Sequence, residues 1–276
     1  MLIATTALLG VLGLLVGSFL NVVIHRVPAG VSIVAPPSAC PTCGARIRWH
    51  DNVPVVSWLL LRGRCRHCGA RISVRYPFIE LATGLAFALV ALGLAPSGML
   101  PPPARLDDGA QWLVLAAYLV FTAAGIALTA IDLELRRLPT PIVWTAAGLL
   151  GLLLAAAAVL RGDVWAIGTA LLAALAMGAF YFVIVLIRPD GMGMGDVRLA
   201  VLVGLATGWI GWDASAVGLL TAFLLGSLVG LGVILAGRGD RRTAIPFGPW
   251  MLAGAWIGVL IGPVAWQWYS GLLGLP

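Results

Sequence analysis

Two acidic residues, Asp132 and Asp196, adjoin long apolar segments of the chain. A carboxylate near the centre of a bilayer costs about 3 kcal/mol, so a carboxylate within or beside a spanning segment calls for a specific role. Two carboxylates within hydrogen-bonding reach of each other share a proton, so one can activate a water molecule while the other polarises a scissile carbonyl. These residues could therefore perform the chemistry of an aspartic protease. From the residues alone, an equally good interpretation is that each aspartate pairs with a nearby arginine, Arg136 or Arg198.

The four cysteines form two CxxC pairs, Cys40 with Cys43 and Cys65 with Cys68, separated by 21 residues. This spacing is typical of a zinc ribbon, in which two short turns present four thiolates to one tetrahedral ion. Because four thiolates leave no open coordination position, the predicted zinc is structural rather than catalytic. A segment this short has difficulty building its own core, and zinc binding can supply about 10 kcal/mol of folding free energy.

The elements that must position these residues are predicted from hydropathy. Of the 276 residues, 61% are hydrophobic and 10% charged, whereas soluble domains carry roughly a quarter charged residues. Apolar runs long enough to cross a bilayer as helices recur along the sequence. The candidate spans are 2–24, 78–96, 111–131, 141–160, 164–187, 198–212, 215–236 and 247–269. We therefore predict an all-α polytopic membrane protein with about eight transmembrane helices and a four-cysteine zinc-ribbon loop between the first two.

Two of these segments have alternative interpretations. The run 2–24 lacks a basic leading segment and is longer than the apolar core of a usual signal peptide, so we expect a retained span. The run 198–212 is the shortest of the eight. A pair of half-length segments flanking Gly211 and Asp213 would give a similar pattern.

The arginines predict the orientation of the chain in the membrane. Fifteen of the 17 arginines lie in alternate intervals between spans, and the other intervals hold only Arg105 and Arg161. Because cytoplasmic loops are enriched in basic residues, the loop 25–77 is predicted to be cytoplasmic and both termini to lie outside. Asp132 and Asp196 then share the cytoplasmic face, and the reducing cytoplasm disfavours disulfides. These loops also account for the net charge of +6, so we expect no nucleic-acid partner.

Several motifs occur in an order that is far more specific than a lone GxGD sequence. They are the run from Gly17 to Arg26, the two cysteine pairs, the runs from Trp58 to Gly63 and from Ile72 to Glu80, the run from Asp132 to Pro139, Gly193-Met194-Gly195-Asp196, and Pro246-Phe247-Gly248-Pro249. Together they cover most of the chain. In this order they resemble the bacterial type IV prepilin peptidases, leader peptidases with N-methyltransferase activity that are grouped with the GxGD aspartic proteases.

The resemblance implies a function. It makes Asp132 and Asp196 the catalytic pair of an enzyme that cuts a type IV prepilin or pseudopilin precursor at the cytoplasmic face of the bacterial inner membrane, in contact with membrane lipid. It also implies N-methylation of the new amino terminus with S-adenosylmethionine. Arg75, Tyr76 and Glu80 are the candidate residues for binding that cofactor, although no glycine-rich nucleotide motif is visible.

By this resemblance, residues 1–96 form the candidate methyltransferase part, with the zinc loop, and residues 97–276 form a six-helix peptidase domain. Two residues depart from the family pattern: Arg198 stands where Lys is common, and Thr140 stands where Asn or Asp is frequent. An alternative function from another class is a membrane assembly or transport component whose zinc ribbon docks a partner. The protease and the assembly or transport component can be distinguished by whether activity depends on both Asp132 and Asp196.

Overall fold

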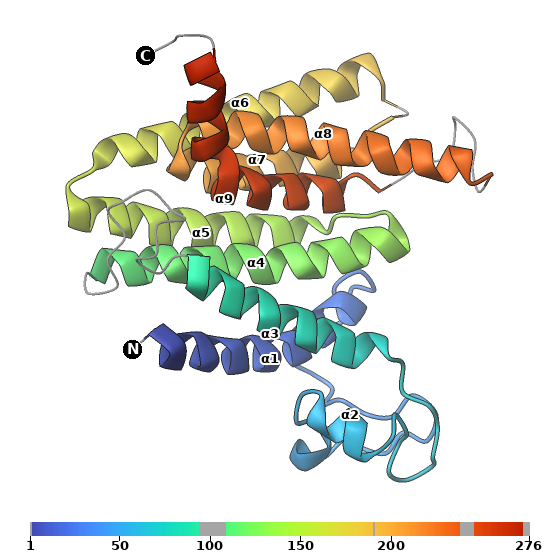
Figure 1. Ribbon diagram of the computed structural model, residues 1–276. Helices are drawn as coiled ribbons and strands as arrows, with labels where there is room; N and C mark the ends of the chain where they lie inside the picture. The colour runs from blue at the N-terminus through green and yellow to red at the C-terminus, as the bar shows by residue number, and fades with distance from the viewer. Residues whose placement is uncertain (1, 94–108, 190, 238–245, 273–276) are drawn as a thin grey trace. The chain divides into compact units, whose positions relative to one another are not determined.

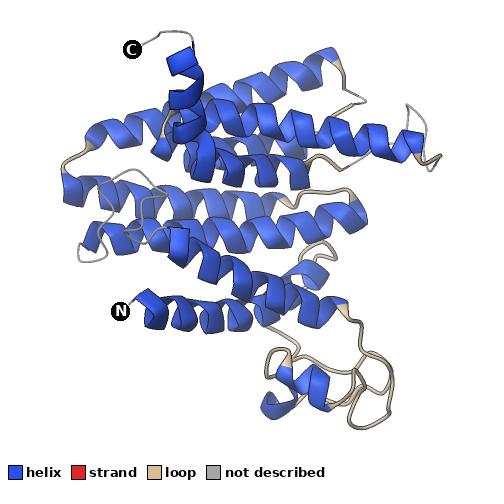
Figure 2. Cartoon of the chain, viewed as in Figure 1, coloured by secondary structure: helices blue, strands red, loops and turns tan. Residues whose placement is uncertain are grey.

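The structure is a computed structural model that describes residues 2–93, 109–189, 191–237 and 246–272 (Figure 1). Over these residues the chain is helical and has no β-strand, only two isolated β-bridges (Figure 2). The chain divides into two compact units, Met1–Leu92 and Gly93–Pro276. The predicted domain boundary between residues 96 and 97 lies outside the described residues. The predicted all-helical fold is confirmed for the described ranges.

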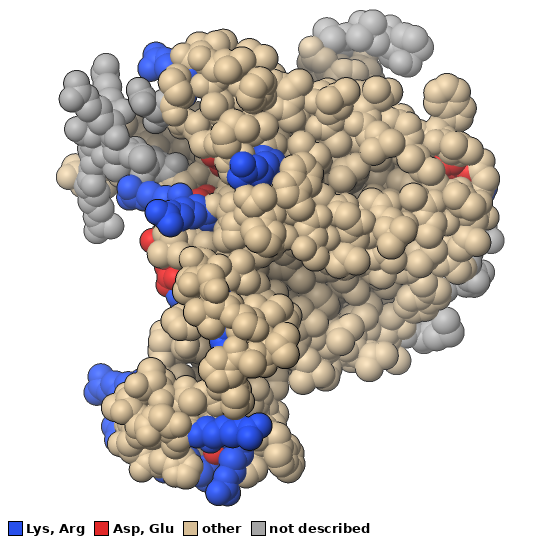
Figure 3. Space-filling view, turned by 180° about the vertical axis from the view of Figure 1, so that it is seen from behind, with Lys and Arg blue, Asp and Glu red and all other residues tan. Residues whose placement is uncertain are grey.

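The first unit contains two long helices and an irregular module between them. Helix α1 spans Leu2–Arg26, and α3 spans Arg75–Gly93. The connecting segment is mostly loop, with a 3-10 helix η1 at Trp49–Asp51 and a short helix α2 at Val56–Leu60 (Figure 2). In the space-filling view, arginine side chains gather on this module, whereas uncharged side chains cover most of the helical surface (Figure 3).

Helices α1 and α3 run antiparallel and approach closely because small residues line their contact. A Cβ at Gly13 would lie 2.7 Å from the carbonyl oxygen of Thr83, and one at Gly17 would lie 2.7 Å from the Cα of Glu80. Real Cβ atoms do not come this near, so glycine is required at both positions. Such small-residue contacts drive helix association in membranes, where apolar burial gives no net gain. The contact also places Glu80 against the carboxyl-terminal half of α1.

The second unit is a bundle of six helices. Their bounds are α4 Gly109–Leu135, α5 Thr140–Arg161, α6 Val164–Ile187, α7 Met194–Ile210, α8 Trp212–Leu235 and α9 Gly248–Leu272. Consecutive helices pair most closely as α4 with α5, α6 with α7, and α8 with α9 (Figure 1). Helix α7 also contacts α5, α8 and α9, so it forms the centre of the bundle.

Tight contacts in the bundle again depend on glycine. A Cβ at Gly204 of α7 would lie 2.5 Å from the Cα of Ala174 in α6. The neighbouring turns of α7 bury Leu199, Leu202 and Ala206 completely. Helix α7 is therefore packed on the protein rather than on lipid, which lets a polar residue at its amino terminus be held by neighbouring helices.

All eight segments predicted as spans form helices, and each lies within a few residues of its predicted bounds. Seven of them, all except α7, are long and apolar enough to cross a bilayer. Helix α7 has 17 residues, which is about 26 Å at 1.5 Å per residue. It is one continuous helix that ends at Ile210, so the alternative of two half-length segments there is not what the structure has. The chain is a multi-pass membrane protein.

Candidate functional site

Asp132 lies in the last turn of α4 and is buried, with 5% of its surface exposed. The backbone N–H of Gly248, the first residue of α9, donates a hydrogen bond of 3.1 Å to its Oδ2 atom. This bond joins residues 116 positions apart in sequence. A helix amino terminus is a favourable place for an anion, because its first N–H groups have no partner within the helix. The Asp132 carboxylate is therefore fixed by the start of α9.

Asp196 is the third residue of α7 and is partly exposed. The backbone N–H of Gly193 donates a hydrogen bond of 3.1 Å to Asp196 Oδ2, and the backbone N–H of Asp196 donates one of 3.1 Å to the Gly193 carbonyl. These reciprocal bonds complete the first turn of the helix in the manner of a capping box. Like Asp132, Asp196 thus has one carboxylate oxygen bound to a backbone N–H at a helix amino terminus.

Leu138 connects the two aspartate segments. A Cβ placed on Gly195 would lie 3.1 Å from the Leu138 Cβ, and one placed on Gly248 would lie 3.2 Å from the Leu138 Cδ2. Leu138 therefore packs against the residue before Asp196 and against the residue that holds Asp132. The two carboxylates are close enough to interact electrostatically. The structure brings the predicted pair together, as the shared membrane face had led us to expect.

The arginines near the aspartates do not pair with them. In the described ranges, neither aspartate forms an ion pair with Arg136 or Arg198. Arg198 instead donates a hydrogen bond of 2.8 Å from its Nη1 to the Oγ1 of Thr140, at the first residue of α5. The two residues that depart from the family pattern thus contact each other. These contacts therefore do not support the alternative interpretation, in which each aspartate forms an ion pair with a nearby arginine.

An aromatic cluster adjoins the aspartate pair. The rings of Phe223 and Phe247 lie 5.1 Å apart, and those of Tyr181 and Phe223 stack at 5.8 Å. Tyr181 is buried and interacts electrostatically with Asp196. Tyr181 and Phe223 were not singled out in the sequence, because each lies in the middle of an apolar run. The only sequence signal for this cluster was Phe247, in the motif before Gly248.

The four cysteine sulfurs lie within 4.8 Å of one another, as the zinc-ribbon prediction requires. The Sγ atoms of Cys40 and Cys68 are 3.8 Å apart. A tetrahedron with zinc–sulfur bonds of about 2.3 Å has edges of about 3.8 Å, so the donor set fits zinc. The backbone N–H groups of Cys43 and Thr42 lower the pKa of the Cys40 thiol to about 6, which favours its metal-binding thiolate, whereas burial and the neighbouring cysteines raise the pKa of the Cys68 thiol to about 11.

Local backbone geometry builds each half of this centre. Gly44 and Gly69 follow the two CxxC pairs with φ of +69° and +72°, a conformation that glycine adopts without steric cost. The N–H of Gly44 donates to the Cys40 carbonyl, and that of Gly69 donates to the Cys65 carbonyl, each at 2.9 Å. Two equivalent turns therefore present the thiolates, which explains why the sequence spacing alone predicted the site.

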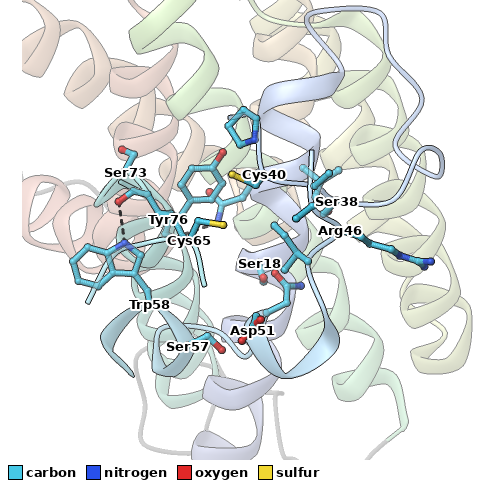
Figure 4. A pocket seen from close by; sticks show the side chains of 18 of the residues that line it. Ser18, Ser38, Cys40, Arg46, Asp51, Ser57, Trp58, Cys65, Ser73 and Tyr76 are labelled. Atoms are coloured by element: carbon cyan, nitrogen blue, oxygen red, sulfur yellow. Dashed lines mark hydrogen bonds between the residues drawn. The ribbon is translucent and has the colours of Figure 1, made fainter. Parts of the chain in front are cut away.

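A cavity of about 670 Å³ lies within the first unit, between α1, the start of α3 and the zinc module. Ser18, Cys40, Asp51 and Tyr76 are among the side chains that line it (Figure 4). Glu80 also lines it and is 8% exposed. This volume is in the usual range for small-molecule sites, and S-adenosylmethionine would fit the mixture of polar and apolar side chains.

Of the three residues predicted to bind the cofactor, Tyr76 and Glu80 line this cavity and Arg75 does not. Arg75 is the first residue of α3. The cavity also contains Asn21, whose Nδ2 donates a hydrogen bond of 3.2 Å to the carbonyl of Tyr76. Asn21 therefore connects α1 to the first turn of α3 beside the cavity.

Comparison with known proteins identifies the family. Residues 11–94 match the bacterial peptidase A24 N-terminal domain, and residues 119–235 match the type IV leader peptidase family. A prepilin leader peptidase/N-methyltransferase of Aeromonas hydrophila is 37% identical over 289 residues, which covers 93% of this chain and 90% of the relative. Proteins of the same name from Burkholderia pseudomallei (strain 1026b) and Pseudomonas putida are 38% and 36% identical, over 88% and 96% of this chain and 81% and 93% of the relatives. No solved structure matches the chain significantly. The chain belongs to the type IV leader peptidase family.

Proposed function

We propose that this protein is a membrane aspartic endopeptidase that removes the leader from type IV prepilin or pseudopilin precursors, with Asp132 and Asp196 as its catalytic pair. One observation carries the proposal. Each carboxylate is held through one oxygen by a backbone N–H at a helix amino terminus, and the two interact without an arginine partner in the described ranges. The names of the curated relatives, prepilin leader peptidases, indicate the substrate class.

The geometry suits a shared-proton mechanism. Oδ2 of each aspartate accepts a backbone hydrogen bond, and Oδ1 of each would accept water or substrate. In the proposed reaction one carboxylate takes a proton from the attacking water, and the other, protonated, donates to the scissile carbonyl oxygen. The water oxygen bonds to the carbonyl carbon; the peptide bond then breaks as the amine takes a proton from the pair, and a hydroxyl proton of the intermediate returns to the pair.

The proposed location is the bacterial inner membrane, with the aspartate pair and the zinc module facing the cytoplasm. The support is the distribution of arginine: Arg136 and Arg137 follow Asp132, and eight of the 17 arginines lie in the segment 25–77. Basic residues stay on the cytoplasmic side during insertion. A precursor with a short basic leader would present its cleavage site at this face.

Cleavage of a pilin-type precursor in membranes tests the proposal. Asp132→Asn and Asp196→Asn each keep the size of the side chain and remove the charge, so each should abolish cleavage while insertion is unchanged. Asp213→Asn, in the first turn of α8, is the matched control and should cleave at the normal rate. Cleavage by either of the first two variants would favour the assembly or transport function instead.

We also propose that the first unit methylates the new amino terminus. The support is the cavity of about 670 Å³ beside the zinc module and the N-methyltransferase activity in the names of the relatives. S-adenosylmethionine would supply the methyl group. In this proposal Glu80, Tyr76 and Asn21 form the polar part of its surroundings. Incubation of a cleaved pilin with labelled S-adenosylmethionine measures this activity separately from cleavage.

Zinc has a structural role in this proposal. Cys40 and Cys65 belong to the wall of the cavity as well as to the metal centre, so the metal would hold that wall in place. Four thiolate ligands leave no position for a substrate. Metal removal should therefore impair methylation by loosening the cavity, without a direct effect on the aspartate pair.

A further inference from the structure

Glu80 is a buried carboxylate on the surface of the cavity in the first unit. It lies in the second turn of α3 and is 8% exposed. The backbone N–H of Val55 donates a hydrogen bond of 2.7 Å to its Oε2 atom, and the side chain of Ser18 is a further partner. A carboxylate offers about four acceptor positions, so these contacts leave capacity for another donor.

Glu80 differs in one respect from the other acidic residue of the cavity. Asp51 is neutralised by Arg66, whose Nη2 lies 2.6 Å from Asp51 Oδ1 and whose Nε lies 2.8 Å from the same atom. This pairing holds the pKa of the Asp51 carboxyl below its usual value. Glu80 has no cationic side chain as a partner within the described residues. A buried charge without a counter-ion is unfavourable, so the site favours a cationic ligand.

The helices around Glu80 present apolar surface. Phe78 and Leu81, its neighbours on α3, are 65% and 46% exposed, and Phe19 on α1 is 50% exposed. A hydrophobic peptide segment that lay along these helices could bring its first residue to the level of Glu80. The group at the start of such a segment is an ammonium, which matches the charge of the carboxylate and its free acceptor positions.

We propose that Glu80 binds the amino-terminal ammonium group of the cleaved substrate and accepts a proton from it. This inference rests on the proposed methyl transfer. An ammonium has no lone pair, so the nitrogen must lose a proton before it can attack a methyl group. Glu80 takes that proton; a nitrogen–carbon bond then forms, and the sulfur–carbon bond of the sulfonium methyl donor breaks with its electron pair left on sulfur. The proton on Glu80 is afterwards lost to solvent through the cavity.

The decisive variant is Glu80→Gln, which keeps the size of the side chain and an oxygen to accept the Val55 N–H bond. Labelled methyl transfer to a synthetic apolar peptide with a free amino terminus should fall about 100-fold or more, the usual contribution of a general base. Precursor cleavage and zinc content should stay normal. Asp163→Asn, which keeps the amino-terminal cap of α6, is the control for loss of a carboxylate elsewhere and should methylate normally.

A binding measurement separates this role from a structural one. The unaltered protein should bind the free-amine peptide more tightly than its N-acetylated form, and Glu80→Gln should bind both equally. Glu80→Asp keeps the charge and should retain the preference for the free amine, which gives a test even if the glutamine variant fails to fold.

Normal methylation by a folded Glu80→Gln variant, or its continued preference for the free amine, would overturn the inference. Loss of S-adenosylmethionine binding in that variant, with the peptide preference retained, would also overturn it. Failure of the unaltered protein to bind S-adenosylmethionine or to methylate any cleaved pilin would instead refute the proposed methyl transfer itself.

Discussion

The substitution Gly248→Ala tests whether the start of α9 positions Asp132, one of the two proposed catalytic residues. A Cβ at this position would lie 2.7 Å from Asp132 Oδ2 and 3.2 Å from the Cδ2 of Leu138. Ordinary contact requires about 3.4 Å or more, so the carboxylate and the start of α9 must separate by about 0.7 Å. The hydrogen bond of 3.1 Å from the Gly248 N–H would then lengthen beyond useful geometry.

The expected loss can be estimated in two ways. A hydrogen bond to a charged group contributes about 1.5–3 kcal/mol, which corresponds to roughly 10- to 150-fold in rate if the bond acts in the transition state. A displacement of about 1 Å in an active site costs about 100-fold. We therefore expect precursor cleavage by Gly248→Ala to fall between about 10-fold and 150-fold, with the protein still inserted in the membrane.

The assay is cleavage of a pilin-type precursor in membranes at matched expression, with methylation of a pre-cleaved peptide measured on the same samples. Gly151→Ala is the matched control, because a Cβ there meets nothing within 4 Å, and it should cleave normally. Methylation by Gly248→Ala should be retained, because the cavity lies in the other unit. Normal cleavage by Gly248→Ala, or an equal loss of both activities, would refute the reasoning.

Three further predictions concern the helix contact in the first unit, the cysteine cluster and the bond between Arg198 and Thr140. Gly17→Ala would place a Cβ 2.7 Å from the Cα of Glu80 in α3, so methylation and thermal stability should fall. Gly10→Ala is the control, because its Cβ would meet atoms only at 3.7 Å, and it should change neither property. Equal effects of the two variants would contradict the close packing of α1 on α3. Cys43→Ser should contain no zinc when its metal content is measured by mass spectrometry, and its methylation activity should fall more than its cleavage activity. Retained zinc would argue against the four-thiolate site. In a double-mutant cycle measured by cleavage rate, Arg198→Ala and Thr140→Val should show a coupling energy of about 1 kcal/mol. If the effects of the two substitutions simply add, the 2.8 Å hydrogen bond between these side chains contributes nothing to cleavage.

Much of this architecture could be predicted from the sequence because its signals are local. Hydropathy defines a span within about 20 residues, and every predicted span contains a helix of nearly the same bounds. The four-cysteine cluster was predictable for the same reason, because each CxxC turn forms its geometry within five residues and closes at Gly44 or Gly69. The prediction for α7 was less clear, since a helix buried among four others does not need the length of a lipid-facing span.

The approach of Asp132 and Asp196 to each other could be predicted from the sequence, because segments predicted to lie at the same membrane face can meet. The contacts that hold them could not be predicted. The Gly248 N–H that binds Asp132 comes from a helix 116 residues further along, and Leu138 joins two glycines from separate segments. No local pattern encodes such contacts.

Glu80 also shows the difference between what the sequence predicts and what the packing decides. The sequence placed Glu80 near the end of a span that is predicted to face the cytoplasm, and a resemblance suggested a cofactor role for it. Only the packing of α1 on α3 through Gly17 buried its carboxylate, and only the folded loop brought the Val55 N–H to it. Hydropathy and residue spacing thus determined the helices and the four-cysteine cluster, and charge predicted an orientation in the membrane. Long-range packing decided the surroundings of each carboxylate, because burial and hydrogen bonding there depend on residues that are far apart in the chain.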